Sequence, residues 1–271
     1  MSTERPLLEA KELSVTFGGL MAVSDVSLRV ESGQLVGLIG PNGAGKTTFL
    51  DAIMGFVKST GKVVLGGKDL SGWPPNRRAR AGLLRTWQSL ELFEDLTVLE
   101  NLEVVSDAIV GGGTLSSLWH SRKGRQSSAA PDALERLGLT YLSEREPGVL
   151  SQGEQKLVSV ARALVGRPQV LCMDEPAAGL NSSESIMLGE HLRGLVEDGL
   201  SMLLVDHDMG LMLSVCDVIY VLEFGAVIAC GTPDVIRADE RVISAYLGGS
   251  QEPRVTNGSA TAGGQGSAPP T

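Results

Sequence analysis

A glycine-rich turn after a short apolar run constrains the fold of this chain more than any other stretch. The run LVGLI at 35–39 leads directly into GPNGAGKTT at 40–48. The spacing G-x-x-x-x-G-K-T within it is the P-loop pattern, which binds phosphate when it joins a buried strand to a helix. We therefore predict a strand over 35–39, a phosphate-binding turn and a helix that begins near Thr47.

The residue types in this turn suggest a role for each. Glycines let the backbone curl so that its N–H groups point at an anion, and the following helix adds the positive end of its dipole. Lys46 is placed to reach the β and γ phosphates, Thr47 to ligate Mg²⁺, and Thr48 to lie near the α phosphate. The flanking context disfavours the alternative, a structural glycine turn with a chance lysine. The predicted nucleotide-binding residues here are Gly40, Pro41, Asn42, Gly43, Ala44, Gly45, Lys46, Thr47 and Thr48.

A second apolar run ends in two adjacent carboxylates. The run VLCM at 170–173 is followed by Asp174, Glu175 and Pro176. At a strand tip, Asp174 would face the metal, and Glu175 would act as the base for a water that attacks the γ phosphate. On its own such a pair is usually a solvated strand end. With the P-loop upstream, we predict a metal ligand and a catalytic base.

The order of these patterns predicts an α/β fold. Segments rich in Val and Leu at 7–30 and 61–66 indicate an antiparallel sheet beside the nucleotide. Compact apolar runs alternate with helical patterns later in the chain, as they do in a parallel sheet covered by helices. These runs lie at 170–173, 202–205 and 218–222.

Two further regions differ from this core. Residues of about 89–165 carry helical patterns without a convincing strand, which predicts a helical subdomain set into a domain that spans 7–249. Within it, the small and polar stretch 111–131 is typical of a surface loop. The stretch 250–271, mostly Gly, Ser, Ala, Pro and Thr, lacks apolar periodicity and is predicted to be disordered.

The composition of the chain indicates which kinds of partner and which cell compartment to expect. The 23 Lys and Arg residues face 32 Asp and Glu, a formal charge of -9, which leaves no broad basic face for nucleic acid. Three widely spaced cysteines lack metal-ligand spacing and indicate buried thiols in a reducing cytosol. No signal peptide and no run of roughly 18 apolar residues is visible. We expect a soluble chain unless another subunit brings it to a membrane.

A short signature completes a set of motifs typical of one family. The stretch LSQGEQ at 150–155 precedes the carboxylate-bearing strand, with a helix expected over 155–165. Together with the P-loop it resembles the ATP-binding cassette (ABC) ATPases, in which this loop completes the ATP site of the opposing subunit. The resemblance implies that Ser151 and Gly153 present a hydroxyl and an N–H to the γ phosphate. The residues carried over as nucleotide-binding are Ser151, Gln152, Gly153 and Glu154.

The signature departs from the family's common LSGGQ. A carboxylate near a γ phosphate would repel it, so Glu154 is expected to point away or to bond backbone. An ordinary helix cap would be the preferred interpretation of this stretch if the other motifs were missing.

The resemblance assigns roles to four more positions. Gln88 matches the Q-loop glutamine, which contacts Mg²⁺ and the attacking water and hinges the helical subdomain. The stretch 177–181 matches the D-loop at the dimer interface, and His207, directly after an apolar strand, matches the histidine that senses the γ phosphate. Phe17 stands where family members stack an aromatic ring on adenine, although core packing is an alternative for it.

Within the family, residues of about 7–249 look like the ATP-binding subunits of branched-chain amino acid importers, whose near relatives serve urea and short-chain amides. This branch implies ATP and Mg²⁺ as cofactors, a second identical or paralogous ATPase, two transmembrane permeases and an external solute-binding protein. It places the chain at the cytoplasmic face of the membrane, with 90–101 as a candidate permease-docking segment or plain helical packing. The phrases that carry it are TFGGLMAV at 16–23, LFEDLTVLEN at 92–101, DEPAAGLN at 174–181, HDM at 207–209 and VISAYLG at 242–248.

The predicted function is that of a motor subunit. Two ATP molecules are sandwiched between the P-loop of one subunit and the signature of the other, so that binding closes the dimer and hydrolysis reopens it. A soluble ABC ATPase of translation or DNA maintenance would usually carry two cassettes or long coiled coils, and neither is present. A nucleotide kinase would leave the signature, Gln88 and His207 without a role.

Overall fold

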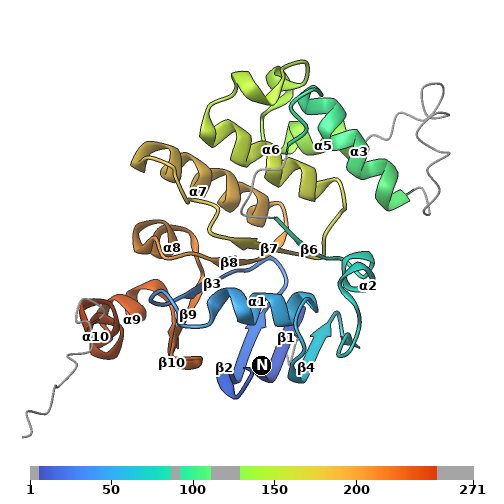
Figure 1. Ribbon diagram of the computed structural model, residues 1–271. Coiled ribbons are helices and arrows are strands. Elements are labelled where there is room, and N and C mark those ends of the chain that lie inside the picture. Colours follow the sequence, from blue (N-terminus) through green and yellow to red (C-terminus); the bar gives the residue numbers. More distant parts are fainter. Residues whose placement is uncertain (1–5, 87–91, 111–128, 249–271) are drawn as a thin grey trace, which may run out of the picture.

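The computed structural model describes residues 6–86, 92–110 and 129–248 (Figure 1). Gln88 and the tail 250–271 lie outside these residues, as does most of the loop predicted at 111–131. The last three residues of that predicted loop belong to helix α5, Ala129–Arg136, so the loop prediction is wrong for residues 129–131.

A six-stranded sheet forms the centre of the molecule, in the order β10-β9-β3-β8-β7-β6. Adjacent strands of this sheet are parallel, except that β10 is antiparallel to β9. This arrangement confirms the parallel α/β core expected from the alternating apolar runs. The strands are β3 (Leu35–Ile39), β6 (Leu83–Arg85), β7 (Val170–Asp174), β8 (Ser201–Val205), β9 (Val218–Glu223) and β10 (Ala226–Gly231).

A second sheet, which is antiparallel, lies on the opposite side of helix α1 from the six-stranded sheet (Figure 1). Its strand order is β2-β1-β4-β5, and it corresponds to the β-rich segments seen in the sequence. Helix α1, Lys46–Met54, packs against strands of both sheets. The strands are β1 (Leu8–Phe17), β2 (Leu20–Val30), β4 (Thr60–Leu65) and β5 (Lys68–Asp69).

Helices cover the face of the six-stranded sheet that points away from α1. The helices of the region between β6 and β7 lie further from the sheet, on the outer side of these covering helices (Figure 1). In the described part of that region no strand is present. Its elements are α3 (Val98–Val110), α5, the 3₁₀ turns Thr140–Leu142 and Pro147–Val149, and α6 (Gln152–Leu164). The remaining helices are α2 (Pro75–Arg80), α7 (Ser182–Glu197), α8 (Met209–Val215), α9 (Pro233–Ala238) and α10 (Glu240–Gly248).

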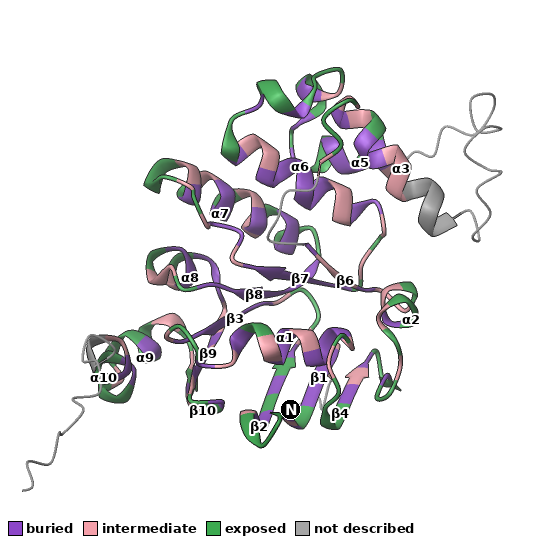
Figure 2. Ribbon diagram, in the orientation of Figure 1, coloured by how far each residue is buried: buried purple, intermediate pink, exposed green. Residues whose placement is uncertain are grey.

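The central strands divide the core into two hydrophobic clusters. On β3, Leu35 and Ile39 join the cluster on the α7 and α8 side, whereas Val36 and Leu38 join the cluster around α1. This alternation follows the two-residue period of a strand, and both faces are buried, as the colouring of Figure 2 shows. Burial on both faces explains why these strands are continuous apolar runs in the sequence. Among the described helices, none has the length and apolarity needed to cross a membrane.

Candidate nucleotide-binding site

The candidate site lies at the carboxyl ends of three adjacent strands. In the sheet, Leu38 of β3 and Asp174 of β7 both pair with Val205 of β8, so the three strands end at one edge. The P-loop follows β3, Glu175 follows β7 and His207 follows β8. Ligands of parallel sheets bind in the crevice outside such strand ends.

Glycine is required in the phosphate loop for steric reasons. Gly40 and Gly45 have φ angles of 154° and 99°. A Cβ at Gly40 would lie 2.1 Å from the carbonyl oxygen of Leu222, and one at Gly45 would lie 2.4 Å from that of Ala22. The loop therefore passes too close to neighbouring backbone to carry side chains at these two positions.

The loop leaves the first N–H groups of α1 available for an anion. Gly45 caps the helix without a side-chain hydrogen bond, and no acidic residue stands in the first turn. Unsatisfied N–H groups together with the helix dipole favour negative charge at this end. The helix begins at Lys46, which confirms the start expected near Thr47.

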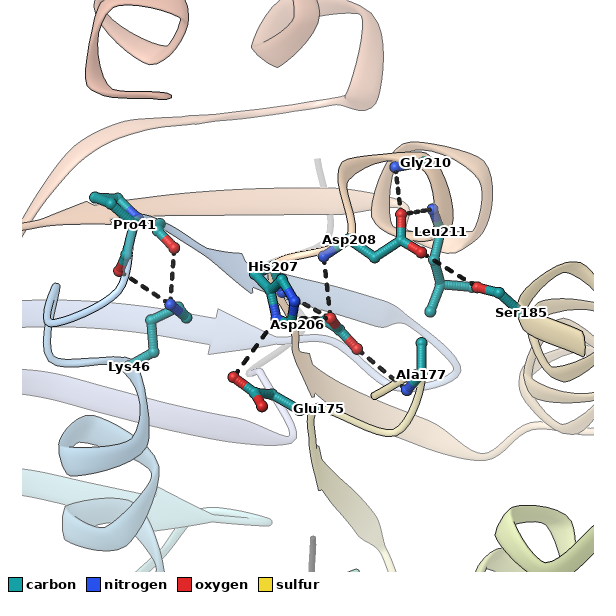
Figure 3. A network of polar contacts seen from close by, with 11 residues as sticks. Pro41, Lys46, Glu175, Ala177, Ser185, Asp206, His207, Asp208, Gly210 and Leu211 are labelled. Atoms are coloured by element: carbon teal, nitrogen blue, oxygen red, sulfur yellow. Dashed lines mark hydrogen bonds and ion pairs between the residues drawn. The ribbon is translucent and has the colours of Figure 1, made fainter. Parts of the chain in front are cut away.

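Lys46 is a buried cation held over the same loop. Its Nζ donates to the carbonyl oxygens of Gly40 at 2.7 Å and Pro41 at 3.1 Å (Figure 3). Burial lowers the pKa of Lys46, while the charges of Glu175 and Asp174 oppose that shift. An anionic ligand would replace the loop carbonyls as the partner of this ammonium and relieve its desolvation.

Asp174 supplies oxygen ligands suited to a divalent cation. Its carboxylate is buried, and Oδ2 accepts from Arg85 at 2.7 Å. Among the described residues, Oδ1 has no hydrogen-bond partner, which leaves one buried oxygen free for a ligand. Burial raises the pKa of Asp174, whereas the Arg85 guanidinium and, to a smaller extent, the Thr47 hydroxyl lower it. A carboxylate and a hydroxyl side by side match the preference of Mg²⁺ for oxygen ligands, phosphates and water.

Glu175 has a strained backbone at the edge of the sheet. Its φ angle is 46°, a left-handed conformation that non-glycine residues rarely adopt. The hydrogen bond from its N–H to the Val205 carbonyl, at 2.7 Å, holds this conformation. The turn directs the side chain into the pocket formed with the P-loop. Such strain in a pocket is typical of a functional residue.

His207 lies between two carboxylates. Its Nδ1 is 3.6 Å from Glu175 Oε1 and 3.5 Å from Asp206 Oδ1 (Figure 3). The fully buried Asp206 accepts from the N–H groups of His207 at 2.7 Å, Asp208 at 3.0 Å and Ala177 at 3.3 Å. Asp206 thus fixes both the loop that carries His207 and the start of the 177–181 stretch after Glu175.

The signature forms the first turn of α6, three residues earlier than the helix predicted over 155–165. The cause is a capping box, in which the Ser151 hydroxyl accepts from Glu154 N–H and the Glu154 carboxylate accepts from Ser151 N–H. Glu154 therefore bonds backbone, one of the two expected outcomes. Ser151 and Gln152 are exposed, whereas Gly153 is buried against the side chain of Glu184.

A pocket of about 450 Å³ lies beside the P-loop, and Gly40, Pro41, Asp174 and His207 do not line it. It unites the loop residues from Asn42 to Thr48 with Glu175, but neither the signature of the same chain nor Phe17 lines it. Phe17 is half-exposed at the end of β1. The lining residues are Leu20, Met21, Ala22, Asn42, Gly43, Ala44, Gly45, Lys46, Thr47, Thr48, Glu175, Phe224 and Gly225.

Sequence reasoning missed three features of this site. Arg85 and Asp206 are the buried partners of Asp174 and His207, and Phe224 lines the pocket. Asp206 directly follows the apolar strand β8, much as Asp174 ends β7, and this pattern is visible in the sequence. Arg85 has no such signal, because its partner stands 89 residues away. The role assigned to Gln88 stays a prediction, since that residue lies outside the described part.

Comparison with known proteins gives two family matches. A model described as "ABC transporter" matches residues 23–178, and one described as "Branched-chain amino acid ATP-binding cassette transporter" matches residues 226–252. The first covers more than half of the chain and includes the P-loop, the signature and Glu175. The second covers β10 and the helices that follow it.

Individual relatives match over nearly their full length. The high-affinity branched-chain amino acid transport ATP-binding protein BraF of Pseudomonas aeruginosa is 40% identical over 255 residues, which are 90% of this chain and 98% of the relative. The protein LivG of Escherichia coli, of the same description, is 41% identical over 251 residues, with 90% and 98% covered. The ADP conformation of MJ1267, an ATP-binding cassette of an ABC transporter, superposes with a TM-score of 0.80 at 31% identity, covering 90% of this chain and all of that one.

Proposed function

The chain belongs to the ABC transporter family of ATP-binding subunits, and from this membership we propose that it is the motor of an importer for branched-chain amino acids. The proposed solute class rests on the match of residues 226–252 to the family model of branched-chain amino acid transporters, and on the similarity to BraF and LivG. The family also makes the chain an ATPase.

ATP binding would begin at the P-loop. The N–H groups of the loop and of the start of α1 would donate hydrogen bonds to the phosphates, and the Lys46 ammonium would turn from the loop carbonyls to the β and γ phosphates. Thr47 and Asp174 would hold Mg²⁺, through the hydroxyl and the unpaired Oδ1. The ion supplies charge neutralisation on the phosphate oxygens. Gln88 is the proposed third contact to the metal and the attacking water.

Cleavage of the γ phosphate would use Glu175 and His207. The Glu175 carboxylate shares the pocket with the P-loop, so a water between it and the γ phosphate would donate its proton to that carboxylate as it attacks. His207, 3.6 Å from the same carboxylate, would orient it and sense whether the γ phosphate is present. Asp206 holds the backbone of His207 in place from below.

The position of the signature outside the pocket of its own chain supports completion of the site by a second ATPase. Ser151, Gln152, Gly153 and Glu154 lie at the start of α6 and do not line the pocket of their own chain. We propose that they contact the nucleotide of a partner ATPase, identical or paralogous, across a dimer that closes with ATP. The α6 N-terminus would then add a second helix dipole to the same γ phosphate.

Transport requires partners that the family implies. We propose that the dimer binds two permeases at the cytoplasmic face of a membrane, and that an external solute-binding protein delivers the solute to these permeases. We propose no nucleic-acid partner. The segment 90–101 stays the candidate for permease docking, and its described part precedes and begins α3. Residues 7–249 would form the ATPase domain and 250–271 a tail.

Uptake of labelled leucine, with labelled urea alongside, tests this proposal in cells whose only copy carries Lys46→Ala. Loss of leucine uptake with urea uptake intact supports the importer of branched-chain amino acids. Loss of urea uptake alone moves the protein to the urea and short-chain amide branch, and no change in either contradicts both solute classes. Lys58→Ala, an exposed lysine that does not line the pocket, is the matched control and should leave uptake unchanged.

A further inference from the structure

An exposed aromatic residue stands at the rim of the phosphate pocket. Phe224 is 88% exposed, yet it lines the same pocket as the P-loop. Leu20 and Met21, on the neighbouring hairpin, also line the pocket and are 71% and 56% exposed. Large apolar side chains left uncovered beside a polar cradle are typical of a ligand site rather than of solvent-facing surface.

The backbone at Phe224 is in a conformation that suits other residues better. Glu223 pairs with Ala226 in a two-residue hairpin between β9 and β10, and the two turn residues, Phe224 and Gly225, have φ angles of 46° and 80°. Positive φ at both positions is the pattern of a type I′ turn, in which Asn-Gly and Gly-Gly are favoured. A phenylalanine in the left-handed region is strained.

Two other hairpins of the same molecule show the favoured choice. Phe17 pairs with Leu20 across Gly18 and Gly19, and Leu65 pairs with Lys68 across a second Gly-Gly turn. All four of these turn glycines have positive φ. The β9–β10 turn also has positive φ at both positions but carries an aromatic residue, which the described part of the chain leaves largely exposed. Such an outlier in a pocket points to function.

The turn is fixed in place against the P-loop. Gly225 N–H donates to the Ala44 carbonyl at 2.9 Å, and Ser24 N–H donates to the Gly225 carbonyl at 2.8 Å. A Cβ at Gly225 would lie 2.7 Å from the carbonyl oxygen of Ala22, so the turn packs closely against the backbone of β2. The β1–β2 and β9–β10 hairpins are therefore held together beside the phosphate loop, and their exposed apolar side chains border one pocket.

We propose that Phe224, with Leu20 and Met21, forms an apolar wall for the nucleobase of the bound nucleotide. This inference rests on the proposed ATP-binding function, since the P-loop fixes the phosphates and the base must lie within a nucleotide's length of them. A flat aromatic base would stack on the ring of Phe224, which is exposed in the described part of the chain. Phe17, the aromatic residue expected from sequence, does not line this pocket.

The variant Phe224→Asn separates a role in binding from a role in folding. Asparagine is favoured in this turn, so the variant should melt no lower than wild type while it loses the aromatic surface. Titration calorimetry with Mg²⁺ would compare ADP, which carries a base, with pyrophosphate, which does not. We expect Phe224→Asn to bind ADP roughly tenfold more weakly and to bind pyrophosphate as wild type does. Phe224→Trp should restore ADP affinity.

Controls keep the two proposals distinguishable. Phe56→Asn makes the same change at an exposed aromatic residue that does not line the pocket, and it should leave ADP affinity unchanged. Equal ADP affinity for Phe224→Asn and wild type would contradict the proposed apolar wall. An equal loss of affinity for ADP and pyrophosphate would also contradict it, because that result indicates a disturbed P-loop. If wild type bound neither ligand, the proposed ATP-binding function itself would be wrong.

Discussion

The Arg85 guanidinium donates to Asp174 Oδ2 at 2.7 Å, and both side chains are buried. The other terminal nitrogen of the guanidinium bonds Asp51 on α1. One arginine at the end of β6 thus joins the helix that follows the P-loop to the strand that carries the proposed metal ligand. Burial raises the pKa of Asp174, and the Arg85 charge opposes that rise.

Removing this arginine should destabilise the fold. Arg85→Gln leaves the buried Asp174 carboxylate without its cation, and the loss of one partner of a buried pair costs about 3–5 kcal/mol. Urea denaturation of the nucleotide-free chain would measure it. Arg193→Gln breaks the half-exposed pair with Asp217 and should cost at most about 1 kcal/mol. Similar losses for the two variants would contradict the importance given to the buried pair.

The two glycine positions of the P-loop should respond differently to alanine. Gly45→Ala places a Cβ 2.4 Å from the Ala22 carbonyl oxygen, whereas Gly43 has a φ angle of 80° with nothing within 4 Å. Gly43→Ala should therefore cost only the conformational strain of about 1–2 kcal/mol, and Gly45→Ala should cost more and abolish ADP binding. Urea denaturation and calorimetry would compare them, and equal destabilisation would show that the loop moves aside freely.

The capping box of α6 should make part of the stability depend on pH. The Ser151 N–H lowers the pKa of Glu154 below its ordinary value of 4.5. Because the folded-state pKa is depressed, this carboxylate contributes stability above the unfolded-state pKa and loses it as the pH falls through the folded-state value. We expect wild type to be more stable than Glu154→Gln by under about 1 kcal/mol at pH 7, and this difference should shrink as the pH falls from 4.5 through the lower folded-state pKa. A difference that stays constant down to pH 3 would exclude the ionised cap.

Asp206 should be needed for catalysis without touching the nucleotide. Its two oxygens accept three backbone N–H groups, so Asp206→Asn turns at least one acceptor into a donor that faces a donor. We expect a loss of stability of about 1–3 kcal/mol and a fall in ATP turnover, because His207 loses its fixed position. ADP affinity should stay close to wild type, since the P-loop is untouched. ATP turnover equal to that of wild type would show that catalysis does not need Asp206 to position His207.

The parts of this fold that follow local rules could be predicted from the sequence. The strand at 35–39 with the P-loop, and β7 with the carboxylates at its end, each combine a buried run with a sharp change of residue type. The alternation of apolar runs and helical patterns likewise indicates the parallel sheet. Even the start of α6 at Gln152 is encoded locally, because Ser151 and Glu154 have the S-x-x-E spacing of a capping box.

The remaining features depend on contacts between distant segments. The position of Arg85 beside Asp174 results from the pairing of β6 with β7, which no local pattern specifies. Phe224 belongs to the pocket only because the β9–β10 turn is bonded to Ala44, far away in the sequence. A single sequence reports which residues are unusual, whereas the strand order decides which of them meet.

The most direct test of the ATPase site is phosphate release by the isolated chain and by Glu175→Gln. Glutamine keeps the size of the side chain and removes the base, so ADP and ATP should bind as in wild type while turnover falls by roughly 10²–10⁴-fold. This result would support Glu175 as the group that activates the attacking water at the edge of the sheet. A variant that releases phosphate at the wild-type rate would contradict the assignment and, with it, the proposed cleavage step.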